Sequence, residues 1–421
     1  MTETLEQART DRAELQRQTL SSLRLAQVPG QAATAGMVAV VTLLASDLLG
    51  SDRLAGIGTA SFTLGAAISM VPLAAFMRRR GRRPGMVVAL LIGAAGSAIA
   101  ASGGQLRFFP LFVVGMVLFG AGQASTLQGR YVAADLAEPG NQATAIAAIV
   151  WIGALGAIFG PLLTPFERAA AESMGLDELI GPFVFATVFF LVAAAVVWTR
   201  LRPDPLAVIG GIDPKATRTR PIKQVRVSVG VIARSPNAKL GFIAMAISQA
   251  VMVGVMTMTP PHMKDHDHAD LSAFVIAVHI VGMYGLAPFV GRAVERIGRV
   301  RSIQIGAVVL GCGTLATVLA GYVPGLMFVG LFLLGLGFNI GLISGSTLLT
   351  TSVPVESKVE VQGTSDLMMS LSGALAAFGS GFVKQSFGFH LLANAGAALA
   401  AGLLVCAWLT ASHSQAPSSP V

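Results

Sequence analysis

The sequence repeats one short basic segment, as MRRRGRRPG at Met77–Gly85 and as GRAVERIGRVRS at Gly291–Ser302. Each copy follows one apolar run and precedes another, and Gly81 and Gly298 lie about 217 positions apart. A helix needs about 20 apolar residues to cross the hydrocarbon core of a bilayer. We therefore expect both copies to be charged turns between membrane-spanning helices, at matching places in two halves of the chain.

Twelve apolar runs are long enough to span a membrane, and most are joined by short turns. The polar, basic, proline-bearing segment 200–238 divides them into six and six. The predicted spans cover residues 28–49, 54–77, 84–102, 108–129, 142–164, 179–199, 239–259, 270–290, 300–320, 324–350, 360–383 and 387–410.

The composition agrees with a membrane protein. The 421 residues are 54% hydrophobic and 12% charged, whereas a soluble domain carries about 25% charged residues. This composition argues against a soluble enzyme and a disordered chain. If the N-terminus is cytoplasmic, every Lys and Arg falls on the cytoplasmic side except Arg53, Arg107, Arg168, Lys264 and Lys384. Such a bias is typical of membrane topology, so the net charge of +8 indicates a lipid bilayer and no nucleic-acid partner.

The predicted fold is an all-α membrane protein with twelve transmembrane helices in two pseudo-symmetric six-helix bundles and both termini in the cytoplasm. Its predicted parts are a tail (1–27), an N-terminal bundle (28–199), a linker (200–238), a C-terminal bundle (239–411) and a second tail (412–421). Spans 4 and 10 also share a Gly-x-Gly pair, Gly120/Gly122 and Gly335/Gly337. Parallel six-span repeats are a transporter architecture, with the substrate site near mid-membrane between the repeats.

The second basic copy resembles the loop motif G-x-x-x-[DE]-R-x-G-R-[RK] of the major facilitator superfamily. The residues that match it are Gly291, Glu295, Arg296, Gly298 and Arg299, with Val300 in the last position. The resemblance covers roughly residues 28–411 and implies a transporter that works by alternating access.

The first basic copy keeps Gly81, Arg82 and Arg83 of the same motif. It departs in two places, because Ala74 replaces the first glycine and Arg78 replaces the acid.

Span 5 contains GALGAIFGPLL at residues 153–163, which is similar to the antiporter motif of the family. Gly156, Gly160 and Pro161 match, and Thr164 stands where a glycine is expected. The resemblance implies that span 5 packs against the other half of the molecule and that protons drive export. Ordinary small-residue packing explains the same glycines. Met116 replaces the basic residue that drug antiporters of the family carry in span 4, so the usual proton relay is incomplete.

Charged residues at the cytoplasmic end predict a gate that ion pairs close when the transporter faces outward. The first basic copy, with Arg78, Arg82 and Arg83, is expected to meet Glu356 and Glu360 at the start of span 11. The second, with Arg292, Arg296 and Arg299, is expected to meet Asp135 and Glu138 before span 5. The alternative is that these arginines only anchor the loops in the cytoplasm.

Polar residues inside the spans are candidates for substrate and proton handling, because such side chains usually face a cavity or a partner helix. They are Gln123, Gln249, His279, Asn339 and Asp366. His279 changes charge near neutral pH, so it or Asp366 is a candidate proton carrier. Alternatively, His279 bonds a neighbouring helix and Asp366 belongs to the gate. The apolar lining favours a hydrophobic or amphiphilic substrate.

The outer loop between spans 7 and 8 reads TPPHMKDHDHAD at Thr259–Asp270. His262, His266 and His268 are of the type that binds zinc, nickel or copper. The sequence therefore leaves open a metal-binding loop, a hydrated loop without metal, and a transition-metal exporter as the protein's function.

The leading functional prediction is a monomeric, proton-coupled exporter of drug-like or small amphiphilic metabolites in the plasma (inner) membrane. A transition-metal exporter and a non-transporting, transporter-like receptor are the alternatives. The sequence shows no nucleophile–base constellation and no phosphate-binding loop of the type G-x-x-x-x-G-K-[ST]. We therefore expect neither an enzyme nor a cofactor.

Overall fold

The computed structural model describes residues 2–50, 56–216, 220–264, 271–320 and 324–414, which form helices and no strand. The long helices of the first half are α1 (Thr2–Leu49), α2 (Gly56–Arg80), α3 (Arg82–Gln105), α4 (Phe109–Asp135), α5 (Gln142–Ser173) and α6 (Gly181–Arg200). The second half contains α9 (Pro236–Lys264), α10 (Ser272–Ile280), the π-helical turn η4 (Val281–Gly285), α11 (Ala287–Ile297), α12 (Arg299–Leu319), α13 (Pro324–Thr351), α14 (Val355–Phe387) and α15 (Phe389–Ser414). Three short helices are η2 (Glu178–Ile180), α7 (Pro205–Val208) and α8 (Pro221–Arg234).

Eleven described helices are long and apolar enough to cross a membrane. A twelfth span is formed by the pair Phe274–Gly285 and Ala287–Ile297, which is bent by 43°. The bend follows the π-helical turn η4 and contains a proline at the start of α11, and both features kink helices. The twelve-span prediction is therefore confirmed when this bent pair counts as one span.

The first helix is longer than its predicted span. α1 runs without a break from Thr2 to Leu49, so residues 2–27 of the predicted tail are part of this helix. The guanidinium of Arg12 donates to Leu136 O at 3.2 Å, and the amide of Gln16 donates to Ala133 O at 2.8 Å. These bonds fasten the beginning of α1 to the end of α4.

The described chain forms two compact units that differ from a simple cut at the linker. Unit 1 comprises residues 1–139, 152–227 and 355–367, and unit 2 comprises 140–151, 228–354 and 368–421. The first turns of α5 therefore pack with unit 2, and the first turns of α14 pack with unit 1. The bundle bounds 28–199 and 239–411 stay a prediction.

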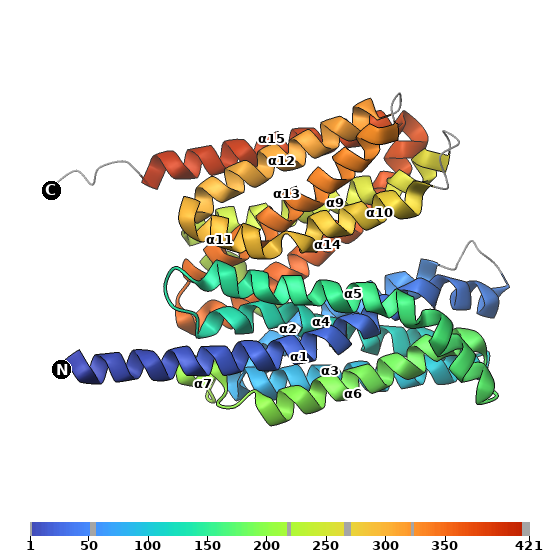
Figure 1. Cartoon of the computed structure of the whole chain (residues 1–421), viewed down its shortest axis with the longest axis horizontal. Coiled ribbons are helices and arrows are strands. Elements are labelled where there is room, and N and C mark those ends of the chain that lie inside the picture. The colour runs from blue at the N-terminus through green and yellow to red at the C-terminus, as the bar shows by residue number, and fades with distance from the viewer. Residues whose placement is uncertain (1, 51–55, 217–219, 265–270, 321–323, 415–421) are drawn as a thin grey trace. The chain divides into compact units, whose positions relative to one another are not determined.

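The same packing pattern occurs inside each unit (Figure 1). In unit 1, α3 packs along α4 and α6, α2 along α4, and α1 along α6. In unit 2, α12 packs along α13 and α15, the bent span along α13, and α9 along α15. Spans 1, 2, 3, 4 and 6 of the first half correspond in these contacts to spans 7, 8, 9, 10 and 12 of the second, so the sequence repeat is also a repeat in packing.

Repeated glycines make the repeated contacts possible. A Cβ on Gly120 would lie 2.2 Å from the backbone nitrogen of Ala66 in α2. At the matching position, a Cβ on Gly335 would lie 2.4 Å from the backbone oxygen of His279 in α10. Both distances are too short for any side chain, so both glycines are required where spans 4 and 10 approach their neighbours.

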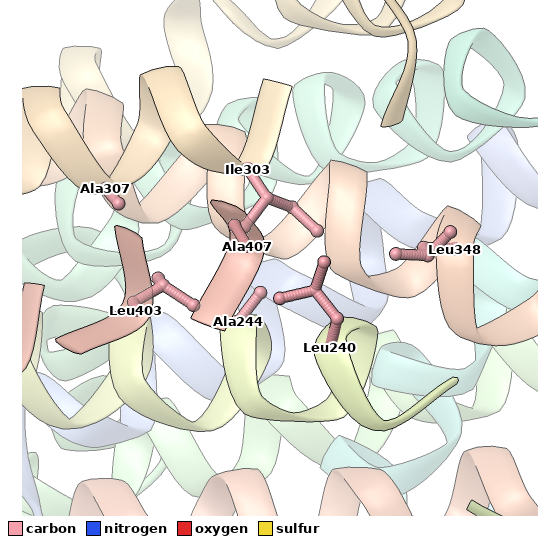
Figure 2. Packing of buried hydrophobic residues seen from close by; sticks show 7 residues of the cluster. All are labelled: Leu240, Ala244, Ile303, Ala307, Leu348, Leu403 and Ala407. Carbon is pink, nitrogen blue, oxygen red and sulfur yellow. The ribbon is translucent and has the colours of Figure 1, made fainter. Parts of the chain in front are cut away.

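Small and branched apolar side chains fill the interior of unit 2 (Figure 2). They come from four helices, α9, α12, α13 and α15, and alternate alanine with larger residues, which lets the helices pack closely. The cluster consists of Leu240, Ala244, Ile303, Ala307, Leu348, Leu403 and Ala407.

Candidate functional site

The turn between α2 and α3 fixes the first basic copy. Gly81 has φ +102°, in the left-handed region that favours glycine. The carboxylate of Asp204 accepts from the backbone nitrogens of Arg82 at 3.1 Å and Arg83 at 2.8 Å, so it caps α3. A Cβ on Gly81 would lie 2.3 Å from that carboxylate. The turn therefore needs glycine for its backbone angle and for space, and it sets the direction of Arg82.

Arg82 is fully buried at the centre of a polar network in unit 1. Its Nε donates to Asp135 Oδ2 at 2.9 Å. Its two terminal nitrogens donate to Gln128 Oε1 at 3.2 Å and to Gln362 Oε1 at 2.6 Å. A buried guanidinium needs acceptors for its donors, and this side chain finds oxygen acceptors on α4 and α14 and the sulfur of Met77 on α2.

One face of α14 supplies the rest of this network. Lys358, Gln362 and Asp366 are four residues apart, so they lie on the same side of the helix. Lys358 Nζ lies 3.0 Å from Asp135 Oδ1. Asp366 is fully buried and forms an ion pair with Arg130. Each of the two buried carboxylates therefore has cationic partners, as burial of charge requires.

Gln128 connects the two buried carboxylates. Its Oε1 accepts from Arg82, and its Nε2 donates to Asp366 Oδ2 at 3.1 Å. The hydroxyl of Tyr131 also donates to Asp366, at 3.1 Å. We call the set of Arg82, Gln128, Arg130, Tyr131, Asp135, Lys358, Gln362 and Asp366 the buried network.

A second, more exposed cluster lies beside the buried network. Arg78 donates to Glu360 Oε2 at 2.6 Å and to Asp213 Oδ2 at 3.4 Å. Asp213 belongs to the basic segment 200–238, and its backbone nitrogen donates to Arg78 O at 2.9 Å. The predicted pairing of the first basic copy with span 11 therefore occurs at Arg78 with Glu360.

The second basic copy contacts the beginning of α5 inside unit 2. Glu295 Oε1 accepts from the backbone nitrogen of Ala143 at 2.5 Å, which places an acid at a helix N-terminus, where it is favoured. Arg299 donates to Thr351 Oγ1 at 2.9 Å and to Gln142 Oε1 at 3.3 Å. The partners recorded for Arg299 are neutral, in contrast to those of Arg82.

The first basic copy departs from the motif at Ala74 and Arg78, and α14 carries a complementary residue opposite each of them. In unit 2, Gly291 faces Ala147, and a Cβ on Gly291 would lie 2.6 Å from that of Ala147. In unit 1, Ala74 faces Gly363, and a Cβ on Gly363 would lie 2.5 Å from that of Ala74. Ala74 and Gly291 are equivalent positions of the two copies, so each contact has one glycine and one alanine, with the glycine on the basic copy in unit 2 and on the facing helix in unit 1.

The same exchange applies to charge. Glu295 in the second copy corresponds to Arg78 in the first; Glu295 contacts the beginning of α5 at Ala143, and Arg78 contacts the beginning of α14 at Glu360. The acid that the motif loses at position 78 therefore appears on the facing helix, where it pairs with Arg78. The first copy therefore still makes a close contact with the facing helix, although its sequence differs from the family motif.

Other predicted gate residues have different partners within their own unit. Asp135 pairs with Arg82 and Lys358 in unit 1, and its predicted pairing with the second copy, which belongs to unit 2, stays a prediction. Arg83 lies over the ring of Trp198, 4.5 Å from its centroid. Arg296 and Glu356 are exposed, and no ion pair is recorded for either in the described part of the chain. Sequence alone gave the charges and could not assign the pairs.

The predicted intramembrane polar residues divide into three groups. Gln123 accepts from Thr34 Oγ1 at 3.0 Å, and Gln249 lies against Gly373, so both sit in helix contacts of their own unit. His279 is buried with Nδ1 2.7 Å from Leu331 O, and Asn339 Nδ2 donates to Gly282 O at 3.5 Å. Asp366 belongs to the buried network. The geometry therefore favours the helix-contact interpretation of His279 and the gate interpretation of Asp366.

The glycines of the antiporter-like segment face α1. A Cβ on Gly156 would lie 2.3 Å from Val28 O, and a Cβ on Gly160 would lie 2.7 Å from Ala32 O. These close contacts of the two glycines lie within unit 1, and the expectation that this segment packs against the other half stays a prediction. Pro161 is exposed inside α5.

The predicted metal loop receives no support from the described residues. His262 is buried and stacks on the ring of Phe389, with centroids 4.1 Å apart. His266 and His268 lie outside the described residues. Among those that are described, no three His, Cys, Asp or Glu side chains are grouped to hold a metal ion.

The sequence indicated Arg82, Asp135 and Asp366 as candidates, but not their partners Arg130, Tyr131, Lys358 and Gln362. The four-residue spacing on α14 was visible in the sequence. Its meaning depended on which helix that face meets, and that is a property of the fold.

Comparison with known proteins agrees with this architecture. The family model described as Major Facilitator Superfamily matches residues 28–287 and 241–420. An uncharacterised MFS-type transporter of Bacillus subtilis, YdeG, is 35% identical over 405 residues, covering 94% of this chain and 92% of its own. The riboflavin transporter RfnT of Brucella anthropi is 28% identical, covering 89% and 91%.

Solved structures share the fold at low sequence identity. The human organic anion transporter MFSD10 has a TM-score of 0.72 at 15% identity, covering 93% of this chain and 99% of its own. The proton:xylose symporter XylE has a TM-score of 0.74 at 12% identity, covering 94% and 96%. The matched family model, the B. subtilis relative and the repeated six-span packing lead to one conclusion: the chain belongs to the major facilitator superfamily of membrane transporters.

Proposed function

We propose that this protein is a monomeric, proton-coupled exporter of small amphiphilic molecules in the plasma (inner) membrane, working by alternating access. The buried network carries the proposal. It joins the beginning of α14, from the second half of the sequence, to α4 through two ion pairs and to α3 through the hydrogen bond from Arg82 to Gln362. Charges that pair when packed and hydrate when separated suit a gate that must open in each cycle.

Two observations support the proposed substrate class, which are the apolar composition of the spans and the similarity to one relative. The spans are rich in apolar side chains, which favours a hydrophobic or amphiphilic molecule over a sugar. The similarity to a riboflavin transporter supports a planar aromatic substrate with polar edges. Riboflavin is therefore the first compound to test, followed by lipophilic drugs.

Transport is best tested in a bacterial strain that lacks its own efflux pumps. Cells that express the chain are expected to retain less riboflavin, or to resist members of a drug panel, and a protonophore is expected to abolish the effect. Equal retention and equal resistance with and without the chain would contradict export. Resistance to zinc, nickel or copper salts alone would instead support the metal-exporter alternative.

The gate is tested in the same cells with two variants. Arg82→Gln removes the central cation of the buried network, and Arg80→Gln removes an exposed arginine two residues earlier. We expect transport to fall for the first and not for the second, at equal amounts of protein in the membrane. If correctly inserted protein changes neither riboflavin retention nor resistance to drugs or metal salts, the receptor alternative is favoured.

A further inference from the structure

One buried acid lies outside the buried network. Glu167 in α5 is 1% exposed, and its Oε2 has no hydrogen-bond partner among the described residues. Asp135 and Asp366, the two carboxylates of the buried network, each pair with a base. Glu167 therefore differs from them in its surroundings, although it lies in a helix that crosses the membrane.

Glu167 lies on the face of α5 that packs against α1. Gly153, Gly156, Gly160 and Glu167 follow one another at helical spacings of three, four and seven residues, so they share this face. A Cβ on Gly36 of α1 would lie 3.5 Å from both Glu167 Oε2 and Gly160 O. The carboxyl group therefore occupies the space that the small residues leave in the α1–α5 contact.

Among the described residues of unit 1, no cation faces this carboxyl group from the elements packed on it. α1 has no charged residue between Arg24 and Asp47, and α6, which touches the backbone of Glu167 through Gly181, has none before Arg200. On α5 itself, Arg168 is paired with Glu178 of η2 at 2.5 Å.

The other charged groups near this end of α5 are also exposed or paired. Glu172 is exposed, and Asp177 of the following loop caps η2 by accepting from the backbone nitrogen of Leu179 at 2.9 Å. Asp47 at the end of α1 is paired with Arg107. Because burying an unpaired charge is very unfavourable, Glu167 is favoured in its neutral, protonated form while the α1–α5 contact is closed.

We propose that the carboxyl group of Glu167 is the binding site of the coupling proton. The inference rests on the proposed function, and it supplies the proton carrier that the apolar Met116 in span 4 cannot provide. The proton enters from water on one side when the α1–α5 contact opens, binds one carboxylate oxygen, and leaves to water on the other side. No other bond is made or broken.

Infrared difference spectroscopy on the purified full chain in lipid nanodiscs tests proton binding without any substrate. A step in pH is expected to change the carboxyl C=O stretching band of the wild type, and Glu167→Gln is expected to remove one component of that change. Glu172→Gln is the matched control, because Glu172 is an exposed acid on the same helix. Identical difference bands for the wild type and Glu167→Gln would overturn the proposal.

Transport in proteoliposomes separates this proposal from the proposed function. With riboflavin as the probe, Glu167→Gln is expected to keep exchange of riboflavin across the membrane and to lose accumulation driven by a pH gradient. Gradient-driven accumulation at the wild-type level would overturn the role of Glu167. If the wild type carries neither riboflavin nor a drug of the panel, the proposed function fails, and the infrared titration still decides whether Glu167 binds the proton.

The variant Glu167→Asp tests whether the effects of Glu167→Gln come from misfolding. It keeps the acid and shortens the side chain, so we expect a monodisperse protein in which the infrared component and part of the gradient-driven accumulation return. Absence of that component in a folded Glu167→Asp variant would count against the proposal.

Discussion

Arg82 is the residue on which the buried network depends most, because its donors reach acceptors on two other helices. Removing one partner of a buried ion pair leaves the other charge without compensation, which costs about 3–5 kcal/mol. We therefore expect Arg82→Gln to lower the thermal unfolding temperature of the purified protein strongly. The measurement is a melting curve in detergent at constant lipid content.

The double variant Arg82→Gln/Asp135→Asn identifies the cause. Removing both charges leaves no unpaired ion at this pair, so we expect it to be more stable than Arg82→Gln alone. If the stability losses of the two single substitutions are additive in the double variant, the stability effect of Arg82 does not come from its pairing with Asp135.

Arg78 and Glu360 allow a charge-reversal test. They lie 2.6 Å apart and are only partly exposed. Exposed ion pairs contribute about 0–1 kcal/mol, so we expect small effects on stability and larger ones on transport. Arg78→Glu and Glu360→Arg should each reduce transport, and the double reversal should restore it in part. Failure of the double variant to recover would show that this pairing does not matter for function.

At the residue scale the sequence was informative about charge and uninformative about partners. The arginines, Glu360 and Asp366 were recognised as gate candidates from their positions near the ends of spans. Asp135 was expected to meet the second basic copy because it precedes span 5 in the sequence, whereas within unit 1 its carboxylate pairs with Arg82 and Lys358. Pairing depends on the helix face, which becomes clear only when the helices are packed.

At the element scale, the contact between α2 and α14 depends on one glycine and one alanine. Gly363→Ala would place two methyl groups 2.5 Å apart, and overpacking of this kind costs about 1–3 kcal/mol. Adding Ala74→Gly moves the glycine to the other helix, which is the arrangement of Gly291 and Ala147 in unit 2. We therefore expect the double variant to regain most of the melting temperature lost by Gly363→Ala.

Gly379→Ala is the control for this experiment. It lies in the same helix, and nothing lies within 4 Å of the position of its added Cβ. Alanine is favoured over glycine inside a helix by about 0.5–1 kcal/mol, so this variant should be as stable as the wild type or more so. A loss of stability for Gly379→Ala equal to that of Gly363→Ala would rule out the steric explanation.

The elements themselves were largely predictable, because hydrophobic length and charged turns define helices in a membrane. The bent span at Phe274–Ile297 and the continuous α1 differ from the prediction for physical reasons. A π-helical turn and a proline bend the first, and α1 continues because its beginning finds hydrogen-bond partners at the end of α4.

At the scale of the whole molecule, the twofold repeat was visible in the sequence and returns as repeated helix packing inside each unit. The sequence did not show with which unit the first turns of each helix pack. The first turns of α5 and α14 each pack with the unit that contains the other half of the sequence. That arrangement places the beginning of α14 beside the first basic copy. There Gly363 makes room for Ala74, and Glu360 pairs with Arg78.

Orientation in the membrane is the remaining whole-molecule prediction, and the positions of the basic residues provide its physical reason. Segment 200–238 is rich in lysine and arginine, so we expect it in the cytoplasm. The test starts from a variant with both native cysteines, Cys312 and Cys406, replaced by alanine. Single cysteines are then introduced at two exposed positions, Lys215 in the basic segment and Met174 after α5.

A thiol reagent that cannot cross the membrane is expected to label Met174→Cys in intact cells and Lys215→Cys only after permeabilisation. The same result fixes the side of the gate, because Asp204 caps α3 and Asp213 pairs with Arg78, and both belong to the basic segment. Labelling of Lys215→Cys in intact cells would place the segment and the buried network outside. The ion pairs would then close the opposite side of the transporter, and the proposed direction of gating would have to be reversed.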